Sequence, residues 1–461
     1  MEPQNLRFGG GAAGTLLHPL VAVELALAII LILCLPRKYA IAPLLLTIFT
    51  VPLGQVVVLA GVHFTIARIL IITGLVRLAT SKRELPTGRF TDGFNSLDQA
   101  FILCALAQLI IFSVQWMEMQ ALIKSLGGFL DTVGGYFVLR FLIQDRGDVR
   151  WTIKVLAIIA VVLGACMLNE HFSNQNVFGL LGGVGSTPSQ RDGQIRSQGA
   201  FALYITAGVF GATLLPLFIW LWSDARSKVA AVFGMVGATV ITFTSNSSTP
   251  LLAYVAGIVG LCFWPLRKHM RPFRWALVLT LVGLHLAMKA PVWALIARVD
   301  LTGSSSGYHR YMLVDNCIRH FSDWWLLGFK GYGAWGWDMW DLCNQYVANA
   351  LTGGLVTLVL FIMVISRSFG RLGTARNLAE GRPKEEWFVW CIGAALFAHV
   401  VALSGVGYWD QIQFAWFTLL AIIPAAVAEA TRSSVPHVQE ALASSYEADA
   451  AVNSDMLETN H

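Results

Sequence analysis

The chain has 461 residues, of which 56% are hydrophobic and 13% charged, with a formal net charge of +5 and a mean hydropathy of +0.63. This composition excludes a soluble globular domain, because the apolar residues come in blocks of about 20, the length that a helix needs to cross a bilayer. The seven cysteines show no CxxC spacing, so the sequence predicts no metal cluster.

About thirteen apolar blocks predict an all-α, polytopic integral membrane protein with about 12–13 transmembrane helices. In chain order the blocks are Gly14–Leu35, Ala40–Ala60, Phe64–Ala79, Leu97–Val114, Ala121–Ile143, Trp151–Leu168, Gly199–Trp222, Val229–Thr244, Leu251–Leu266, Trp275–Ala290, Leu355–Ser366, Trp387–Leu403 and Ile412–Ala428. The eleventh helix is expected to begin earlier, within Asn344–Gly354. No cleavable signal peptide precedes the first block, which reads as an uncleaved anchor. The transmembrane domain is therefore expected to span residues 1–430, and the polar, acidic stretch 431–461 is predicted to be a disordered cytosolic tail.

Basic residues gather in alternate connections between the blocks, after the first, third, fifth, seventh, ninth and eleventh: Arg37, Lys38; Lys82, Arg83, Arg89; Arg146, Arg150; Arg226, Lys228; Arg267, Lys268, Arg271, Arg274; Arg367, Arg371, Arg376, Arg382, Lys384. By the positive-inside rule this predicts a multi-pass membrane protein with its N-terminus on the outer side and its C-terminus in the cytoplasm. In a Gram-negative host this corresponds to the cell inner membrane with a periplasmic N-terminus. Two long segments then face outward. They are Asn169–Gln198 and a large periplasmic loop at about 291–354, before the third-last helix.

The outward-facing segments contain arginines that topology does not require: Arg191, Arg196, Arg298, Arg310 and Arg319. A planar guanidinium suits a phosphate or diphosphate, which it holds by paired, charge-assisted hydrogen bonds. The alternative is ordinary surface charge, or ion pairs with Asp192, Asp300, Asp315 and Asp323. The same loop has five tryptophans between Asp323 and Gly354, which are typical of an interfacial aromatic belt.

Four stretches in the second half of the chain form an ordered series of motifs. They are RSQGAFALYITAGVFGATLLPL (Arg196–Leu217), SNSSTPLLAYVAGIVG (Ser245–Gly260), HRYMLVDNCIRHFSDWWLLGFKGYG (His309–Gly333) and DLCNQYVANALTGGLVTLVLFI (Asp341–Ile362). The series resembles the O-antigen ligases and related bacterial polysaccharide polymerases. In order, the four stretches are similar to that family's entry into a membrane helix, its Thr/Ser-rich turn and following helix, its large-loop pattern, and the start of its next helix. The resemblance covers roughly Gln194–Leu419.

The resemblance implies a metal-independent, inverting glycosyltransferase that needs no cofactor. Its donor would be a glycan linked through diphosphate to undecaprenol, and its acceptor a hydroxyl of lipid A–core or of another glycan. Membrane lipid is a further expected partner, and nucleic acid is not. The family pattern points to Arg310 and Arg196 as catalytic residues that stabilise the leaving diphosphate. Substrate-binding roles are expected for Arg191, Arg319, His320, Lys330, Asp341 and Asn344.

One position departs from the family pattern. Cys343 stands before Asn344 where the family commonly has histidine. Either that histidine is not essential in this branch, or another group supplies the base, or the activity differs. His309, His320, Asp315 and Asp341 are the candidates to replace it, and His309 ranks first because it adjoins Arg310 and histidine titrates near neutral pH. A disulfide between Cys317 and Cys343 would brace the loop in an oxidising compartment.

Other functions stay open at this point. The sequence does not separate a ligase from a polymerase, and a non-catalytic binder of lipid-linked glycan is a third interpretation. A transporter or flippase would explain ionisable residues inside the apolar blocks, which are Glu24, Asp131, His285 and Lys289. Ion pairing with Arg68, Lys124 or Arg140 would explain them equally well. The sequence lacks the internal symmetry that is typical of many transporters. The glycines of GFKGYGAWGW (Gly328–Trp337) allow close backbone approach, either to a sugar or to helix ends.

Overall fold

The computed structural model describes residues 14–59, 61–81, 89–298 and 307–434. Within this part of the chain, eight helices are long and apolar enough to cross a membrane, or nine if a bent pair is counted as one span. The eight are α4 (Ser96–Trp116), the continuous α5–α6 (Met119–Leu142), α7 (Arg146–Ser173), α8 (Tyr204–Trp222), α9 (Lys228–Thr244), α14 (Gln345–Leu378), α15 (Pro383–Ala402) and a last helix, Ile412–Ser434. All thirteen apolar blocks contain a helix. The predicted all-α, polytopic membrane fold is confirmed.

The N-terminal helices are shorter than the sequence suggests. Helices α1 (Pro19–Cys34) and α2 (Ile41–Thr50) have only 16 and 10 residues, so the second apolar block is not one spanning helix. It ends at Thr50 and continues as the hairpin of β1 (Val56–Leu59) and β2 (Val62–Thr65). The reason is local: Pro52 and Gly54 interrupt the helix, and the β-branched run Val56–Val58 favours a strand. Helix α3 (Ile66–Thr80) follows directly.

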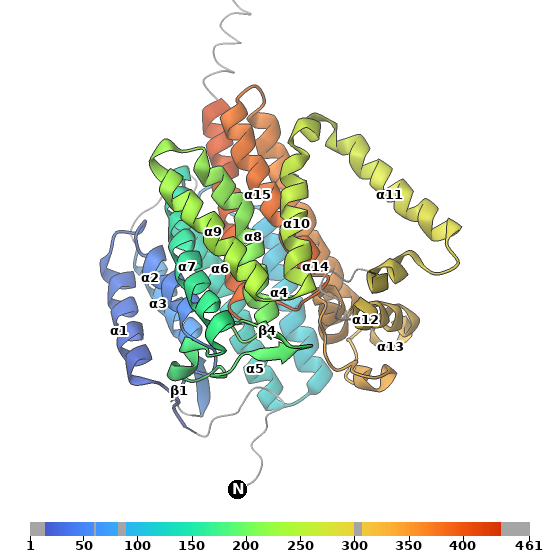
Figure 1. The fold of residues 1–461 in the computed structure, drawn as a ribbon, viewed down its shortest axis with the longest axis horizontal. Helices are drawn as coiled ribbons and strands as arrows, with labels where there is room; N and C mark the ends of the chain where they lie inside the picture. The colour runs from blue at the N-terminus through green and yellow to red at the C-terminus, as the bar shows by residue number, and fades with distance from the viewer. Residues whose placement is uncertain (1–13, 60, 82–88, 299–306, 435–461) are drawn as a thin grey trace, which may run out of the picture.

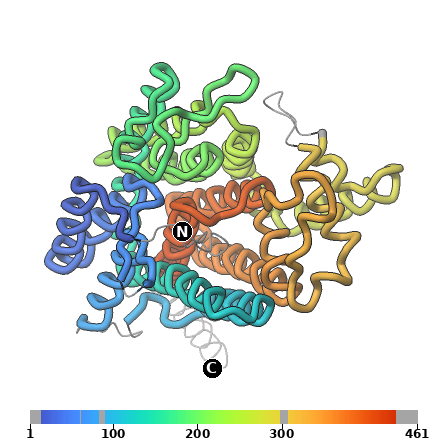
Figure 2. The backbone as a smooth tube through the Cα atoms, turned by 90° about the horizontal axis from the view of Figure 1, so that it is seen from below, coloured from blue at the N-terminus to red at the C-terminus, as the bar shows by residue number. Residues whose placement is uncertain are grey.

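The centre of the bundle is formed by α8 and the last helix, each with 83% of its apolar window buried. Seen from below, the red C-terminal part is surrounded by the green, blue, cyan and orange parts of the chain (Figure 2). Glycines allow neighbouring helices to approach closely. A Cβ on Gly237 of α9 would lie 2.6 Å from the Ala160 carbonyl oxygen of α7, and one on Gly211 of α8 would lie 2.6 Å from that of Ala238. Small residues at contacts are the usual means of packing helices in membranes.

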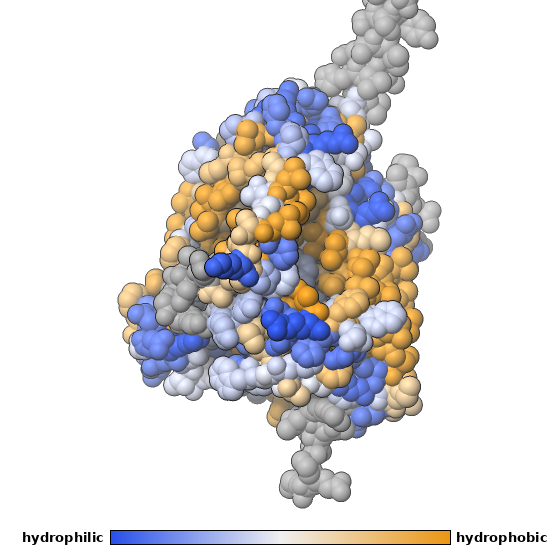
Figure 3. Space-filling model, turned by 90° about the vertical axis from the view of Figure 1, so that its right-hand side faces the viewer, coloured by the Kyte–Doolittle hydropathy of each residue, from blue (hydrophilic) through white to orange (hydrophobic). Residues whose placement is uncertain are grey.

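One helix leaves the bundle. Helix α10 (Ser248–Cys262) is followed by α11 (Met270–Ala287) at a bend of 73°, and Figure 1 shows α11 projecting to the side. No residue of α11 is buried. On the face that carries α11, hydrophobic side chains spread over the middle of the molecule and hydrophilic ones gather at the upper end and in the lower part (Figure 3). The tenth block is thus helical, but it counts as part of a span only together with α10.

The segment between α11 and α14 forms a small subdomain at the end of the bundle that also carries the β-hairpins (Figure 1). It contains α12 (Gly307–Arg319) and α13 (Phe321–Trp324). It is attached to α14, whose start at Gln345 confirms the expected early beginning of the eleventh helix. Helix α14 breaks at Gly354, which has φ 65° and ψ −173°. At this break Leu355 donates its N–H to the Trp325 carbonyl at 2.8 Å, and Phe329 donates to the Leu351 carbonyl at 2.8 Å.

Three of the four ionisable residues inside the apolar blocks, Glu24, Asp131 and His285, form hydrogen bonds with other residues. Arg68 donates two hydrogen bonds to the Asp131 carboxylate, at 2.9 and 2.6 Å, and Glu24 accepts one from the Thr50 hydroxyl at 3.1 Å. Arg140 pairs with Asp98 instead, at 2.9 Å and fully buried. His285 lies near the C-terminal end of α11, and Lys289 comes after that helix. The ion-pair explanation therefore holds for Asp131. The predicted tail begins later than expected, because the last helix continues to Ser434. The rest of that prediction, 435–461, lies outside the described residues.

Candidate functional site

Helix α12 is fixed in position by polar contacts from its own side chains. Asp315 accepts hydrogen bonds from the Trp293 indole N–H at 3.1 Å and from Arg319 at 2.7 Å. Asn316 donates to the Trp335 carbonyl at 3.5 Å and to the Met339 sulfur at 3.4 Å. The helix is thereby held to the segment that leads into α14. This brings the N-terminal turn of α12, with His309 and Arg310, against residues 338–344.

The loop before α14 is equally well defined. Asn344 is buried and caps the helix, since its side-chain oxygen accepts the N–H groups of Tyr346 and Val347 at 2.9 and 3.2 Å. Its amide group donates to the Ser404 carbonyl at 3.1 Å, which attaches the loop to the connection after α15. Asn344 therefore has a structural role here, although the sequence suggested substrate binding. One residue earlier, the Cys343 N–H donates to the Asp341 carbonyl at 3.0 Å and closes a tight turn.

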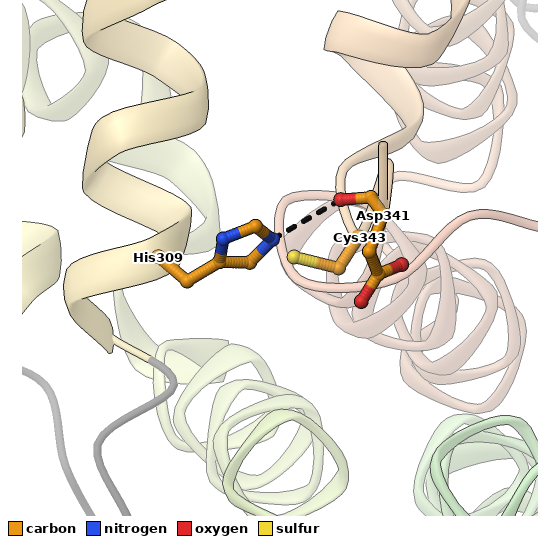
Figure 4. A group of neighbouring side chains, drawn as sticks. All are labelled: His309, Asp341 and Cys343. Carbon is orange, nitrogen blue, oxygen red and sulfur yellow. Dashed lines mark hydrogen bonds between the residues drawn. The ribbon is translucent and has the colours of Figure 1, made fainter. Parts of the chain in front are cut away.

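These two elements form the His309 cluster, defined as His309, Arg310, Asp341 and Cys343. The His309 Nε2 atom lies 3.1 Å from the Asp341 carbonyl oxygen. One donor atom from each of His309, Asp341 and Cys343 lies within 4.8 Å of the other two. Figure 4 shows the Cys343 sulfur pointing toward the Nε2 side of the imidazole, while Nδ1 faces away from Asp341. Arg310 is buried, with 8% of its surface exposed.

The electrostatics of the His309 cluster follow from burial and from neighbouring charges. Partial burial raises the pKa of the Asp341 carboxyl, an effect that His309 and Arg310 oppose and Asp338 reinforces. Burial raises the pKa of the Cys343 thiol to about 12, with Arg310 acting in the opposite direction. The thiol is thus protonated at neutral pH and is not a general base. This leaves the His309 imidazole as the group of the cluster best suited to accept a proton.

Arg196 lies at the end of a different element, the hairpin of β3 (Ser189–Arg191) and β4 (Gln194–Arg196). It is 6% exposed, and its guanidinium donates to the Tyr204 hydroxyl at 2.8 Å and lies 4.8 Å from the centre of the Tyr204 ring. The neighbouring chain is fixed by Glu170, whose carboxylate accepts the Gly199 N–H at 2.9 Å. The strand leads directly into the N-terminus of α8. The two predicted catalytic arginines therefore come from separate elements, each buried at the same end of the bundle.

The other predicted binding residues have structural partners. Arg191 is exposed and lies 3.8 Å from Asp192, and Arg319 forms the ion pair with Asp315, as the surface-charge alternative anticipated. His320 stacks on Trp335 with ring centres 4.6 Å apart. Lys330 lies over the Trp116 ring at 4.4 Å. The structure brings only Asp341 of this set into the His309 cluster.

The disulfide considered between Cys317 and Cys343 is not formed in the structure, where both are free thiols. Cys317 belongs to a small apolar core with Trp324, Val347 and Leu351, whereas Cys343 faces the imidazole of His309. The aromatic-belt interpretation is also incomplete. Trp337 and Trp340 are exposed, but Trp324 is buried and donates to the Cys317 carbonyl at 2.6 Å.

A cavity of about 400 Å³ lies between α4, α5, α14 and the last helix. None of the four residues of the His309 cluster lines it, and its first lining residue after Cys343 along the chain is Gln345. Gln345 and Asn349, on the first turns of α14, line it together with Gln108, Lys124 and Tyr408. Most of its remaining wall is aromatic or aliphatic, from α4, α5 and the last helix. An apolar cavity with a few convergent polar groups is the usual form of a ligand site.

Sequence reasoning missed Asp410, which lies in the connection after α15. It is 1% exposed and accepts hydrogen bonds from the Thr206 hydroxyl at 2.5 Å and the Ile412 N–H at 3.0 Å. Burial raises its pKa to about 6. The only signal in the sequence is an acidic residue directly before the last apolar block, a place where a solvated carboxylate is equally common.

The chain matches no model of a known protein family, and a search of curated proteins finds no match.

Proposed function

We propose that the protein transfers a glycan from an undecaprenyl-diphosphate-linked donor to a hydroxyl of lipid A–core, at the outer face of the cell inner membrane. The proposal includes a periplasmic N-terminus and a cytoplasmic C-terminus. The observation that carries it is the buried Arg310 beside His309 and Asp341, at one end of a membrane-spanning bundle. The motif resemblance supplies the substrate class, and the cluster supplies the chemical groups that such a reaction needs.

In the proposed reaction the acceptor oxygen attacks the anomeric carbon in one displacement, which inverts its configuration. The bond from that carbon to the diphosphate oxygen breaks, and the lipid diphosphate leaves with the bonding electrons. His309 accepts the proton of the acceptor hydroxyl. If Nε2 donates to the Asp341 carbonyl, the lone pair of Nδ1 is available for this proton. Arg310 then stabilises the negative charge that grows on the leaving diphosphate, and its partly buried setting weakens solvent screening.

The neighbouring cavity supports a lipid-linked donor. Its polar lining, Gln345 and Asn349, lies within two turns of the His309 cluster, and its aromatic wall extends between α4 and α14. The isoprene units nearest the diphosphate would bury their apolar surface there, and the rest of the chain would lie in the bilayer. Arg196 would contribute a second guanidinium from the end of β4.

The decisive test is glycan transfer by purified protein in lipid vesicles, with lipid-linked glycan and lipid A–core as substrates. Arg310→Ala should lower the rate by about 100-fold or more, the typical effect of removing one group that stabilises the transition state. Arg196→Ala should also lower it strongly. Arg310→Lys should restore only part of the rate, because an ammonium lacks the paired donors of a guanidinium. Arg319→Ala is the matched control, since Arg319 is exposed and pairs with Asp315.

Full transfer activity in both Arg310→Ala and Arg196→Ala would refute the mechanism. Deleting the gene separates the related functions. Long glycan that accumulates on undecaprenyl diphosphate indicates a ligase. Single repeat units that still reach the surface indicate a polymerase. Unchanged pools of surface and lipid-linked glycan would contradict both and favour a transporter or flippase.

A further inference from the structure

The His309 cluster combines three donor types that the proposed reaction does not use together: an imidazole nitrogen, a thiol sulfur and a carboxylate oxygen. Their donor atoms lie within 4.8 Å of one another. His309 comes from α12, and Asp341 and Cys343 come from the loop before α14, so two separate elements converge on one point (Figure 4). The geometry points to a site for a borderline divalent cation, and we propose that this cation is Zn²⁺.

The donor set selects the metal. Thiolate and imidazole ligands favour Zn²⁺ and its neighbours among the transition metals, whereas Mg²⁺ and Ca²⁺ prefer oxygen ligands alone. Zn²⁺ commonly binds three protein ligands and leaves a fourth position to water or substrate. The three residues here match that number.

The charge balance also suits a divalent cation. Among the described residues, the charged groups that act on Asp341 and Cys343 are His309, Asp338 and Arg310, besides these two residues themselves. With a metal bound, His309 is neutral and Cys343 is a thiolate. Three negative groups against one guanidinium leave a net charge of two negative units, which a divalent cation neutralises. Binding displaces the thiol proton to solvent and moves the imidazole proton from Nε2 to Nδ1, so that Nε2 can bind the metal.

The backbone of the ligand residues is held in place before any metal arrives. The turn from Asp341 to Cys343 is closed by a backbone hydrogen bond, and Asn344 fixes the loop to Ser404. Asn316 ties α12 to Trp335 and Met339, which sets the distance between His309 and the loop. This support positions the backbone of the ligands. Metal binding still requires the His309 Nε2 atom to leave the Asp341 carbonyl oxygen and the three side chains to close around the ion.

Metal binding at this site does not depend on the proposed function. The effect of the metal on activity, however, rests on the proposed function. A metal on Nε2 would move the imidazole proton to Nδ1, the nitrogen assigned as the base. Zn²⁺ is therefore expected to inhibit glycan transfer. Because binding is measured without substrate, a failure of the proposed function would leave the binding result unaffected.

The experiment uses the full chain, purified in detergent, treated with a chelator and titrated with Co²⁺ as a spectroscopic probe. The expected result is one equivalent of bound Co²⁺ with a thiolate-to-metal charge-transfer band, which Zn²⁺ abolishes by replacing the cobalt. The band should be lost in Cys343→Ser and in His309→Gln and weakened in Asp341→Asn. Cys317→Ser is the matched control and should keep the band, because the Cys317 side chain packs in the small apolar core with Trp324 and Val347.

Absence of the band from the unmodified protein would overturn the proposal, as would a band that persists in Cys343→Ser. Circular dichroism and gel filtration of each variant show whether it is folded. If Cys343→Ser fails to fold, Cys343→Ala and the His309→Gln variant give the same comparison, and retention of the band in either would equally overturn the site.

Discussion

Replacing Gly354 by alanine should detach the subdomain from α14. At φ 65° and ψ −173°, Gly354 occupies a region of backbone space that is essentially reserved for glycine, and another residue there costs about 1–3 kcal/mol. A Cβ would also lie 2.5 Å from the Leu326 carbonyl oxygen and 3.2 Å from that of Trp325. If the segment around Trp325 and Leu326 moves away, the hydrogen bond from the Leu355 N–H to the Trp325 carbonyl is lost. This loss lowers the free energy of unfolding by about a further 1 kcal/mol.

The two effects together predict a loss of about 2–4 kcal/mol in the free energy of unfolding. The measurement is thermal unfolding of the purified protein in one detergent, followed by tryptophan fluorescence. Limited proteolysis of the same samples should show faster cleavage between residues 325 and 343, because the loop would no longer be docked.

Gly370 provides the control within the same helix. A Cβ there meets no atom within 4 Å, so Gly370→Ala should stabilise α14 by about 0.5–1 kcal/mol by restricting the unfolded chain. An unchanged unfolding temperature in Gly354→Ala would refute the reasoning. A decrease of the same size in Gly370→Ala would refute it as well, because the effect would then be general to glycines of α14.

Two further predictions concern buried charge. Arg140→Met should lower the free energy of unfolding by about 3–5 kcal/mol, because it leaves Asp98 buried without its cation. Adding Asp98→Asn should recover part of this loss. A double variant as unstable as Arg140→Met alone would contradict the ion-pair explanation. Asp410 should make stability depend on pH. Its pKa of about 6 in the folded protein exceeds the ordinary value of 3.8, so its contribution is fully present below about pH 4 and is lost as pH rises through 6. Unfolding curves between pH 5 and 8 should therefore show a steeper loss of stability for the unmodified protein than for Asp410→Asn, and parallel curves would contradict the assignment.

The sequence predicted the helices well because hydrophobic length is a direct physical signal in a membrane protein. The sequence-based prediction failed where the backbone preferences of particular residues, such as proline, glycine and valine, compete with hydrophobic length. Pro52, Gly54 and three successive valines turn the second block into a hairpin, although its hydropathy is that of a helix. The 73° bend between α10 and α11 was equally invisible, because both halves are apolar and helical.

The candidate site shows the same division. Arg310 was selected from the family resemblance and His309 from its adjacency to Arg310, and the structure brings both beside Asp341. The partners of Arg319, His320 and Lys330 are set by packing between distant segments, such as the contact of Lys330 with Trp116, and no local pattern contains that information. The sequence marked Cys343 as an exception to a family pattern, yet its place facing the imidazole became evident only when α12 and the loop were seen together.

The subdomain between α11 and α14 carries the whole His309 cluster in one continuous segment of the chain. Its reactive side chains all come from one continuous stretch, residues 309–343, and described contacts such as Phe329 to Leu351, Leu355 to Trp325 and Asn344 to Ser404 dock it on the bundle. Exchange of this one segment would therefore replace the whole His309 cluster while the helices of the bundle, and Arg196 with them, stayed the same. Chimeras joined at Gly307 and Gly354 would exchange this segment as one unit.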